Sequence, residues 1–167
     1  SSPLLPLGSA PAGAGEGIEH RREPTTANPA GDIHLDGARC KAGGMRIVSV
    51  TEPGGPENLF ITEAAPPFAA PGEVLVAVHA AGVNRADLLQ RQGFYPPPPG
   101  ASDIIGLEVA GAIVELGEGV HGWAIGDECV ALLAGGGYAE YVNVPAGQVI
   151  RPPAGIDLIS AGGLIEA

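Results

Sequence analysis

From Met45 onward the chain consists of short apolar runs separated by turns that are rich in glycine and proline. The clearest runs are Val74–Val78, Val109–Leu116, Glu128–Leu133 and Tyr138–Val144. Many of the 27 glycines and 17 prolines of the chain lie between such runs. Short strands at a spacing of roughly 8–12 residues are typical of small barrels and sandwiches. The pattern therefore predicts a mainly β domain rather than a helical bundle.

Residues 1–44 differ in kind from the rest of the chain. They mix Gly, Pro, Ala, Ser and scattered charges, and they show no sustained period of two or of 3.6. A segment with so little apolar surface cannot offset the entropy cost of its own ordering. We therefore predict that residues 1–44 form a disordered extension. A mitochondrial transit peptide is disfavoured, because Glu16, Glu19 and Glu23 make this segment too acidic.

The overall charge and the cysteine count exclude several classes of partner. The formal net charge is -11, which disfavours nucleic acids and anionic membrane surfaces. No apolar stretch approaches the roughly 18 residues that a membrane-spanning helix needs. The two cysteines, Cys40 and Cys129, lie far apart, so they form neither a disulfide framework nor a metal-ligand spacing. A reducing, cytoplasmic location is the expectation.

Local patterns place a hairpin and a short helix in the first half of the domain. Met45–Val50 and Leu59–Thr62 are predicted to pair across a turn that contains prolines and glycines. Arg85–Gln92 is predicted to be helical, because Asn84 can cap its start and Gly93 can end it.

A second helix is predicted close to the last residue of the sequence. Ser160 can cap it, and Ala161, Leu164 and Ile165 are its apolar residues. The predicted organisation is thus an extension over 1–44, a domain over 45–159 and the beginning of a helix over 160–167.

One segment matches a dinucleotide-binding pattern, and we reject the match. Gly117, Gly119 and Gly122 satisfy Gly-x-Gly-x-x-Gly after a predicted strand. The pattern also requires a helix whose N-terminus faces the pyrophosphate. Gly126 interrupts any helix there, and Glu118 would place a negative charge beside the phosphates. We predict a turn.

The segment Asn84–Gly111 resembles the catalytic-domain signature of the medium-chain dehydrogenase/reductase family. It holds Asn-Arg-Ala-Asp-Leu, the run Pro96–Gly100 and the sequence Gly106-Leu107-Glu108. Zinc-dependent members of that family carry cysteine at the position of Asn84 and histidine at that of Leu107. Neither an amide nor an alkyl group can replace these zinc ligands. The resemblance therefore points to the zinc-free quinone oxidoreductases.

The resemblance implies a fold and an activity, both of which are expectations. The fold is a GroES-like, partly open β-barrel with short helices over 45–159, and the Rossmann domain that normally follows is absent, as in a truncated chain. The activity is transfer of hydride from NADPH to a quinone without zinc, and the full-length enzyme is compatible with a homodimer. Asn84 and Tyr95 would line the cleft for substrate and cofactor, while Asp87 and Glu108 would be structural. For Glu108 a structural hydrogen bond or an ion pair, with Arg85 or Arg91 as its partner, is expected.

Two alternatives stay open at this point. The chain could be a non-catalytic truncated isoform that retains only partner binding. It could also be a GroES-like binding module without enzymatic activity, because a fold does not fix a function.

Overall fold

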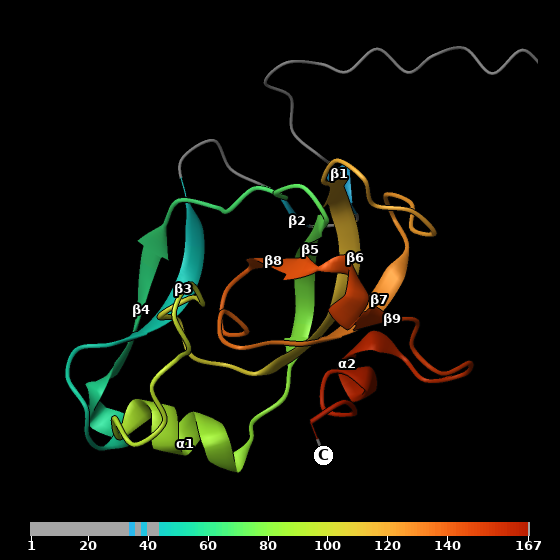
Figure 1. Cartoon of the computed structure of the whole chain (residues 1–167). Coiled ribbons are helices and arrows are strands. Elements are labelled where there is room, and N and C mark those ends of the chain that lie inside the picture. Colours follow the sequence, from blue (N-terminus) through green and yellow to red (C-terminus); the bar gives the residue numbers. More distant parts are fainter. Residues whose placement is uncertain (1–33, 36–37, 40–43, 167) are drawn as a thin grey trace, which may run out of the picture. The chain divides into compact units, whose positions relative to one another are not determined.

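Antiparallel strands dominate the computed structural model of the chain, which describes residues 34–35, 38–39 and 44–166 (Figure 1). Two short strands, β1 (His34–Leu35) and β2 (Ala38–Arg39), pair with each other. They fall in the segment that we predicted to be disordered, and they were not expected there. Apart from Gly44, the rest of the predicted extension lies outside the described residues.

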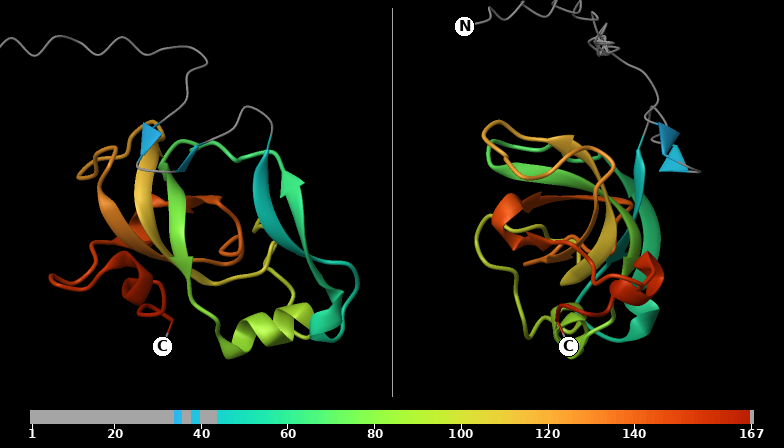
Figure 2. Two further views of the ribbon diagram at one scale, coloured as in Figure 1. Left: turned by 180° about the vertical axis from the view of Figure 1, so that it is seen from behind. Right: turned by 90° about the vertical axis from the view of Figure 1, so that its right-hand side faces the viewer.

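Five strands form the main sheet, in the order β8-β5-β6-β7-β9, and every neighbouring pair is antiparallel. Their bounds are Glu73–Ala81 for β5, Glu108–Leu116 for β6, Glu128–Leu132 for β7, Tyr141–Pro145 for β8 and Val149–Ile150 for β9. The sheet curls on itself, as the two views of Figure 2 show. The predicted mainly β, partly open barrel is confirmed.

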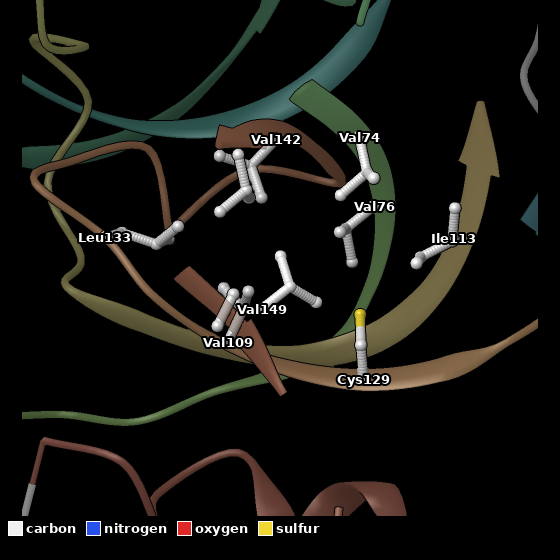
Figure 3. Packing of buried hydrophobic residues seen from close by; sticks show 10 residues of the cluster. Val74, Val76, Val109, Ile113, Cys129, Leu133, Val142 and Val149 are labelled. Carbon is white, nitrogen blue, oxygen red and sulfur yellow. The ribbon is translucent and has the colours of Figure 1, made fainter. Parts of the chain in front are cut away.

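Strand β5 is buried on both faces, as its unbroken apolar run predicts. Successive side chains of a strand point to opposite faces, so the strand serves two cores. Val74 and Val76 lie in the larger core, which β6, β7, β8 and β9 complete (Figure 3). Leu75 and Ala77 lie in a second core together with Met45. Strand β5 therefore joins the two apolar clusters.

A separate hairpin joins this sheet through a short connecting segment. Strands β3 (Met45–Val50) and β4 (Leu59–Ala64) pair in register around the 3-10 turn η1 (Pro56–Asn58), as predicted. Residues Tyr138–Glu140 were expected to begin the last long strand, but β8 starts only at Tyr141. Residues 138–140 run beside β3 instead, where the Val48 N–H donates to the Tyr138 carbonyl at 2.8 Å.

The two α-helices lie at the same end of the barrel in all views (Figures 1 and 2). Helix α1 spans Arg85–Arg91, as predicted, and α2 spans Leu158–Ala161. The 3-10 turn η2 (Ala146–Gln148) precedes β9. The prediction that Ser160 caps the last helix is wrong. Asp157 is the cap, since its carboxylate accepts from the Ser160 N–H at 2.9 Å.

The glycine-rich match to the dinucleotide pattern forms a loop. Gly119 and Gly122 have φ of 80° and 81°, which a helix does not allow. The next element is strand β7, so no helix N-terminus follows the glycines. The rejection of this motif is confirmed.

Candidate functional site

A polar cluster is buried where strand β5 leads into helix α1. Asn84 holds the N-cap position in an extended conformation. Asp87, in the first turn, is only 2% exposed, and its Oδ2 accepts from the Asn84 backbone N–H at 2.7 Å. This contact satisfies one of the backbone donors that a helix start leaves without an intrahelical partner. Asp87 thus fixes the start of α1.

Tyr138 brings the second polar contact to Asp87 from a distant part of the chain. Its hydroxyl donates to Asp87 Oδ2 at 2.9 Å. Burial raises the pKa of Tyr138, and the hydrogen bond to the Asp87 carboxylate raises it further. The phenol therefore stays a donor at neutral pH. Among the described residues, Asp87 Oδ1 has no hydrogen-bond partner although it is buried.

Glu108 forms the other half of the cluster and is only 1% exposed. Its Oε1 accepts from Asn84 Nδ2 at 2.7 Å. Its Oε2 accepts from the backbone N–H groups of Ile165 and Glu166 at 2.9 and 3.1 Å. The carboxylate therefore links the start of α1 to the chain that follows α2.

Of the two expected roles of Glu108, the structural hydrogen bond is confirmed and the ion pair is wrong. Within the described part of the chain, Glu108 pairs with neither Arg85 nor Arg91. The guanidinium of Arg91 donates to the Gly54 carbonyl at 3.0 Å, so it holds the turn of the β3–β4 hairpin. Amide and backbone N–H groups take the place of a cation around this carboxylate.

Two glycines make room for the cluster. A Cβ on Gly82 would overlap with the Glu108 carboxylate, so the approach of this side chain to β5 requires glycine. Gly106 has φ of 106°, and a Cβ there would collide with Gly137 and the Tyr138 ring. These two positions let Glu108 and Tyr138 pack against backbone.

Tyr95 lies away from this cluster, beyond the opposite end of α1. It is 46% exposed and lines a cavity of about 300 Å³. Pro53 from the hairpin turn, Arg91 from α1 and Ile105 line the same cavity. Asn84 is not among its lining residues. The structure therefore does not bring together the two residues predicted to share a cleft.

Sequence reasoning missed Tyr138 and the backbone donors of Ile165 and Glu166. A tyrosine directly after Gly135-Gly136-Gly137 is a signal that could have marked Tyr138, because such glycines let a chain pass close to its neighbours. The backbone donors have no signal in the sequence, since every residue except proline carries one.

The residues of the cluster are joined to one another by hydrogen bonds. In the described ranges, no three His, Cys, Asp or Glu side chains come together to hold a metal ion. Leu107 is 4% exposed and contributes an alkyl group to the interior. Cys129 is fully buried, and burial, with a smaller contribution from the charge of Asp127, raises the pKa of its thiol to about 12. Such an environment favours the protonated thiol over the nucleophilic thiolate.

The profile of the family described as "Alcohol dehydrogenase GroES-like domain" matches residues 70–154, which is half of the chain. The chain belongs to this family. The match covers β5, α1 and the strands β6 to β9, and so includes most of the polar cluster.

Individual relatives place this GroES-like domain among the medium-chain dehydrogenases/reductases. The chain is 35% identical over 123 residues to the synaptic vesicle membrane protein VAT-1 homolog of Rattus norvegicus, covering 72% of this chain and 30% of that protein. It is 37% identical over 115 residues to the quinone oxidoreductase of Lama guanicoe, covering 68% and 35%. This GroES-like chain therefore spans about a third of the length of the curated relatives that it matches.

The fold of the GroES-like domain matches solved structures as well. The structure of Escherichia coli quinone oxidoreductase complexed with NADPH superposes with a TM-score of 0.63 at 33% identity, covering 70% of this chain and 36% of that one. In the described part of our chain, neither helix is long and apolar enough to cross a bilayer. The family and its similarity to oxidoreductases are thus established from both sequence and structure.

Proposed function

We propose that this domain is the catalytic-domain part of an oxidoreductase that transfers hydride from NADPH to a quinone without zinc. Its similarity to quinone oxidoreductases of llama and Escherichia coli supports the reaction class. The observation that carries the proposal is the pair Asn84 and Leu107, which stand where zinc-dependent relatives have cysteine and histidine. An amide bound to Glu108 and a buried alkyl group do not fit a zinc ion.

Asn84 and Tyr95 are the residues that we assign to substrate and cofactor. Bound NADPH would supply the hydride, and the protein would supply orientation and exclusion of water. Asn84 is half-buried at the start of α1, where its amide is held rigidly by Glu108. Tyr95 offers an exposed phenol beside a cavity of about 300 Å³, which suits stacking on a planar ring. Asp87 and Glu108 hold Asn84 in place and do not react.

The same proposal includes the arrangement of the whole protein. We assign residues 45–159 to the catalytic domain and residues 160–167 to the start of a connection to a dinucleotide-binding domain. The described residues hold no glycine-rich turn followed by a helix, which is the element that binds a pyrophosphate. We therefore expect the chain by itself to bind NADPH weakly. A cytoplasmic location belongs to this proposal too.

The test joins this chain to the dinucleotide-binding part of the Escherichia coli quinone oxidoreductase. We expect the chimera to oxidise NADPH in the presence of a quinone, and the chain alone to be inactive. Tyr95→Ala should lower kcat/KM by roughly five- to tenfold, as loss of an aromatic contact worth about 1 kcal/mol implies. Tyr95→Phe is the matched control, since it keeps the ring and removes only the hydroxyl.

Three results would contradict the proposal. Stoichiometric zinc in protein purified without a chelator would overturn the zinc-free assignment. Unchanged kcat/KM of the Tyr95→Ala chimera across several quinones would remove Tyr95 from the site. A well-folded chimera that binds NADPH but reduces no quinone would favour a non-catalytic binding module instead.

A further inference from the structure

The loop after α1 carries the only run of more than two prolines in the sequence, Pro96–Pro99. Each proline ring fixes φ at about −65°, and a residue that precedes proline is driven to an extended ψ. Tyr95 and the first three prolines of the run each precede a proline, so both backbone angles of those three prolines are fixed. The two angles are those of a polyproline II helix. The run is therefore a rigid left-handed helix before any partner binds it.

The exposure of the run follows the period of this helix. A polyproline II helix has three residues per turn, so Tyr95 and Pro98 lie on one edge. Pro96 and Pro99 lie on the second edge. All four are exposed, whereas Pro97, on the third edge, is half-buried. Two edges of the helix thus face solvent, and the third faces the domain.

The backbone of the run offers hydrogen-bond acceptors and no donors. Proline has no N–H group, and in the described part of the chain the carbonyls of Tyr95, Pro96 and Pro97 accept no hydrogen bond. The Pro98 carbonyl accepts from the Ala101 N–H at 3.0 Å, where the chain turns away. A partner must therefore combine apolar surface with hydrogen-bond donors. Aromatic-lined grooves supply both, because tyrosine and tryptophan rings carry an O–H or N–H group.

We propose that Pro96–Pro99 docks into the aromatic-lined groove of a proline-recognition domain whose rim is basic. The sign of the rim follows from charge, since the chain carries a net charge of -11 and the exposed Asp103 follows the run closely. The nearest cation in the sequence, Arg91, donates to the Gly54 carbonyl. A rigid segment loses little conformational entropy on docking, which favours binding of so short a ligand. This interaction goes beyond the proposed function and does not depend on it.

The experiment uses the full chain without cofactor, and the probe is an EVH1 domain with a basic rim. Calorimetry should show saturable binding with a Kd in the micromolar range, because a short segment buries less surface than a standard interface. NMR of the labelled chain should show amide shifts concentrated at Tyr95, Gly100 and Ala101, which flank the prolines. An SH3 domain chosen for an acidic rim should bind at least about tenfold more weakly.

Pro98→Ala is the deciding variant, and the chain offers a matched control. The substitution removes two ring methylene groups from an exposed edge and should weaken EVH1 binding about tenfold. Pro153→Ala removes the same atoms from another exposed proline. The Pro153 carbonyl also accepts from the third N–H along, that of Ile156 at 3.3 Å, and Gly155 has φ of 83°, against 87° for Gly100. The control should bind like the unaltered chain, and thermal melting checks that both variants fold.

Three results would overturn the inference. The first is the absence of saturable binding to an EVH1 domain that binds a free proline-rich peptide in the same buffer. The second is a folded Pro98→Ala chain that binds as tightly as the Pro153→Ala chain. The third is tighter binding to the SH3 domain, which would contradict the assigned charge of the rim. None of these measurements involves NADPH or a quinone, so hydride transfer by the chimera is tested separately.

Discussion

The apolar core of the five-stranded sheet and the two carboxylates of the polar cluster at the start of α1 are equally buried, but they are stabilised in different ways. The core around Val74, Val76 and Ile113 has members that are less than 9% exposed, and none of them is charged. The cluster contains two carboxylates, Asp87 and Glu108, at 2% and 1% exposure. The stability of the core depends on how well the volumes of its side chains fill the interior. The stability of the cluster depends on the number and direction of its hydrogen-bond donors.

The polar cluster, unlike the core, also contains an energetically unfavourable group. Asp87 Oδ1 is a buried oxygen without a partner among the described residues, and such a group costs about 1–3 kcal/mol. The larger core holds no comparable atom. A buried cost of this kind is more often found at functional positions than in a purely structural interior. This supports the proposal that the cluster serves the cleft.

The largest effect is expected in the core. Ile113 is fully buried, and Ile113→Ala should lower the free energy of unfolding by about 2–5 kcal/mol, because it removes apolar contacts and leaves a cavity. Ile113→Val is the matched control, with an expected cost of about 0.5–1.5 kcal/mol. Urea unfolding followed by fluorescence measures both. A cost for alanine no larger than that for valine would mean that this core is loosely packed.

Substitutions in the polar cluster should lower the free energy of unfolding by less than Ile113→Ala does, but their effects should depend strongly on one another. Tyr138→Phe leaves Asp87 Oδ2 with one donor in place of two, which should cost about 1–3 kcal/mol. Asp87→Ala removes the acceptor, so Tyr138→Phe should cost much less in that background. A double-mutant cycle by urea unfolding tests this. Additive effects of the two substitutions would show that the hydroxyl and the carboxylate do not cooperate.

Cys129 offers a pH-dependent test of the core. The folded pKa of its thiol, about 12, exceeds the ordinary value of 9.0. When the pKa of an acidic group is higher in the folded state, its contribution to stability is fully present below the unfolded pKa. That contribution is lost as the pH rises from about 9 to 12. The loss at pH 10 should be on the order of 1 kcal/mol, and Cys129→Ala should abolish this part of it.

An independent labelling experiment checks the same residue. In a Cys40→Ser chain at pH 8, iodoacetamide should modify Cys129 only after unfolding, since the folded thiol is buried and protonated. Rapid labelling of the folded protein would show that the core opens to solvent.

The smallest effect is expected at the surface, where a substitution changes neither core packing nor the burial of a charge. The hydrogen bond from Arg151 is the main cause that lowers the pKa of Asp127. Arg151→Ala should raise that pKa toward 3.8, which NMR titration of the carboxyl carbon measures. A depressed folded pKa contributes stability above the unfolded value, and this contribution is lost as the pH falls through the folded pKa. An unchanged titration curve would assign the shift to the Ala124 N–H instead.

The sequence predicted those parts of the fold that local pattern controls. Strand β5 and the β3–β4 hairpin follow from apolar runs and turn residues, and α1 follows from Asn84 and Gly93 at its two ends. The start of α2 was misplaced because Asp157 and Ser160 are both good cap residues and only three positions apart. Local rules do not choose between two such residues.

The cluster could be predicted only in part, because most of its contacts join distant segments. The Asp87 contact to Asn84 spans three residues and is a local helix-start pattern. The contact of Glu108 with Ile165 spans 57 residues, and that of Tyr138 with Asp87 spans 51. An arginine would match Glu108 by charge, but the Asn84 amide and two backbone N–H groups donate to this carboxylate instead.

The strand order has a consequence for how the chain reaches this structure. Strand β5 is synthesised early, but its neighbours β6 and β8 come much later in the chain. Closing such long loops makes folding slow, in the range of milliseconds to seconds for sheet proteins of this kind. The β3–β4 hairpin needs only a short loop and can form within microseconds. During translation, one edge of β5 therefore stays unpaired until β6 has left the ribosome and the other until β8 has done so, and in this interval the valine-rich strand is most exposed to aggregation.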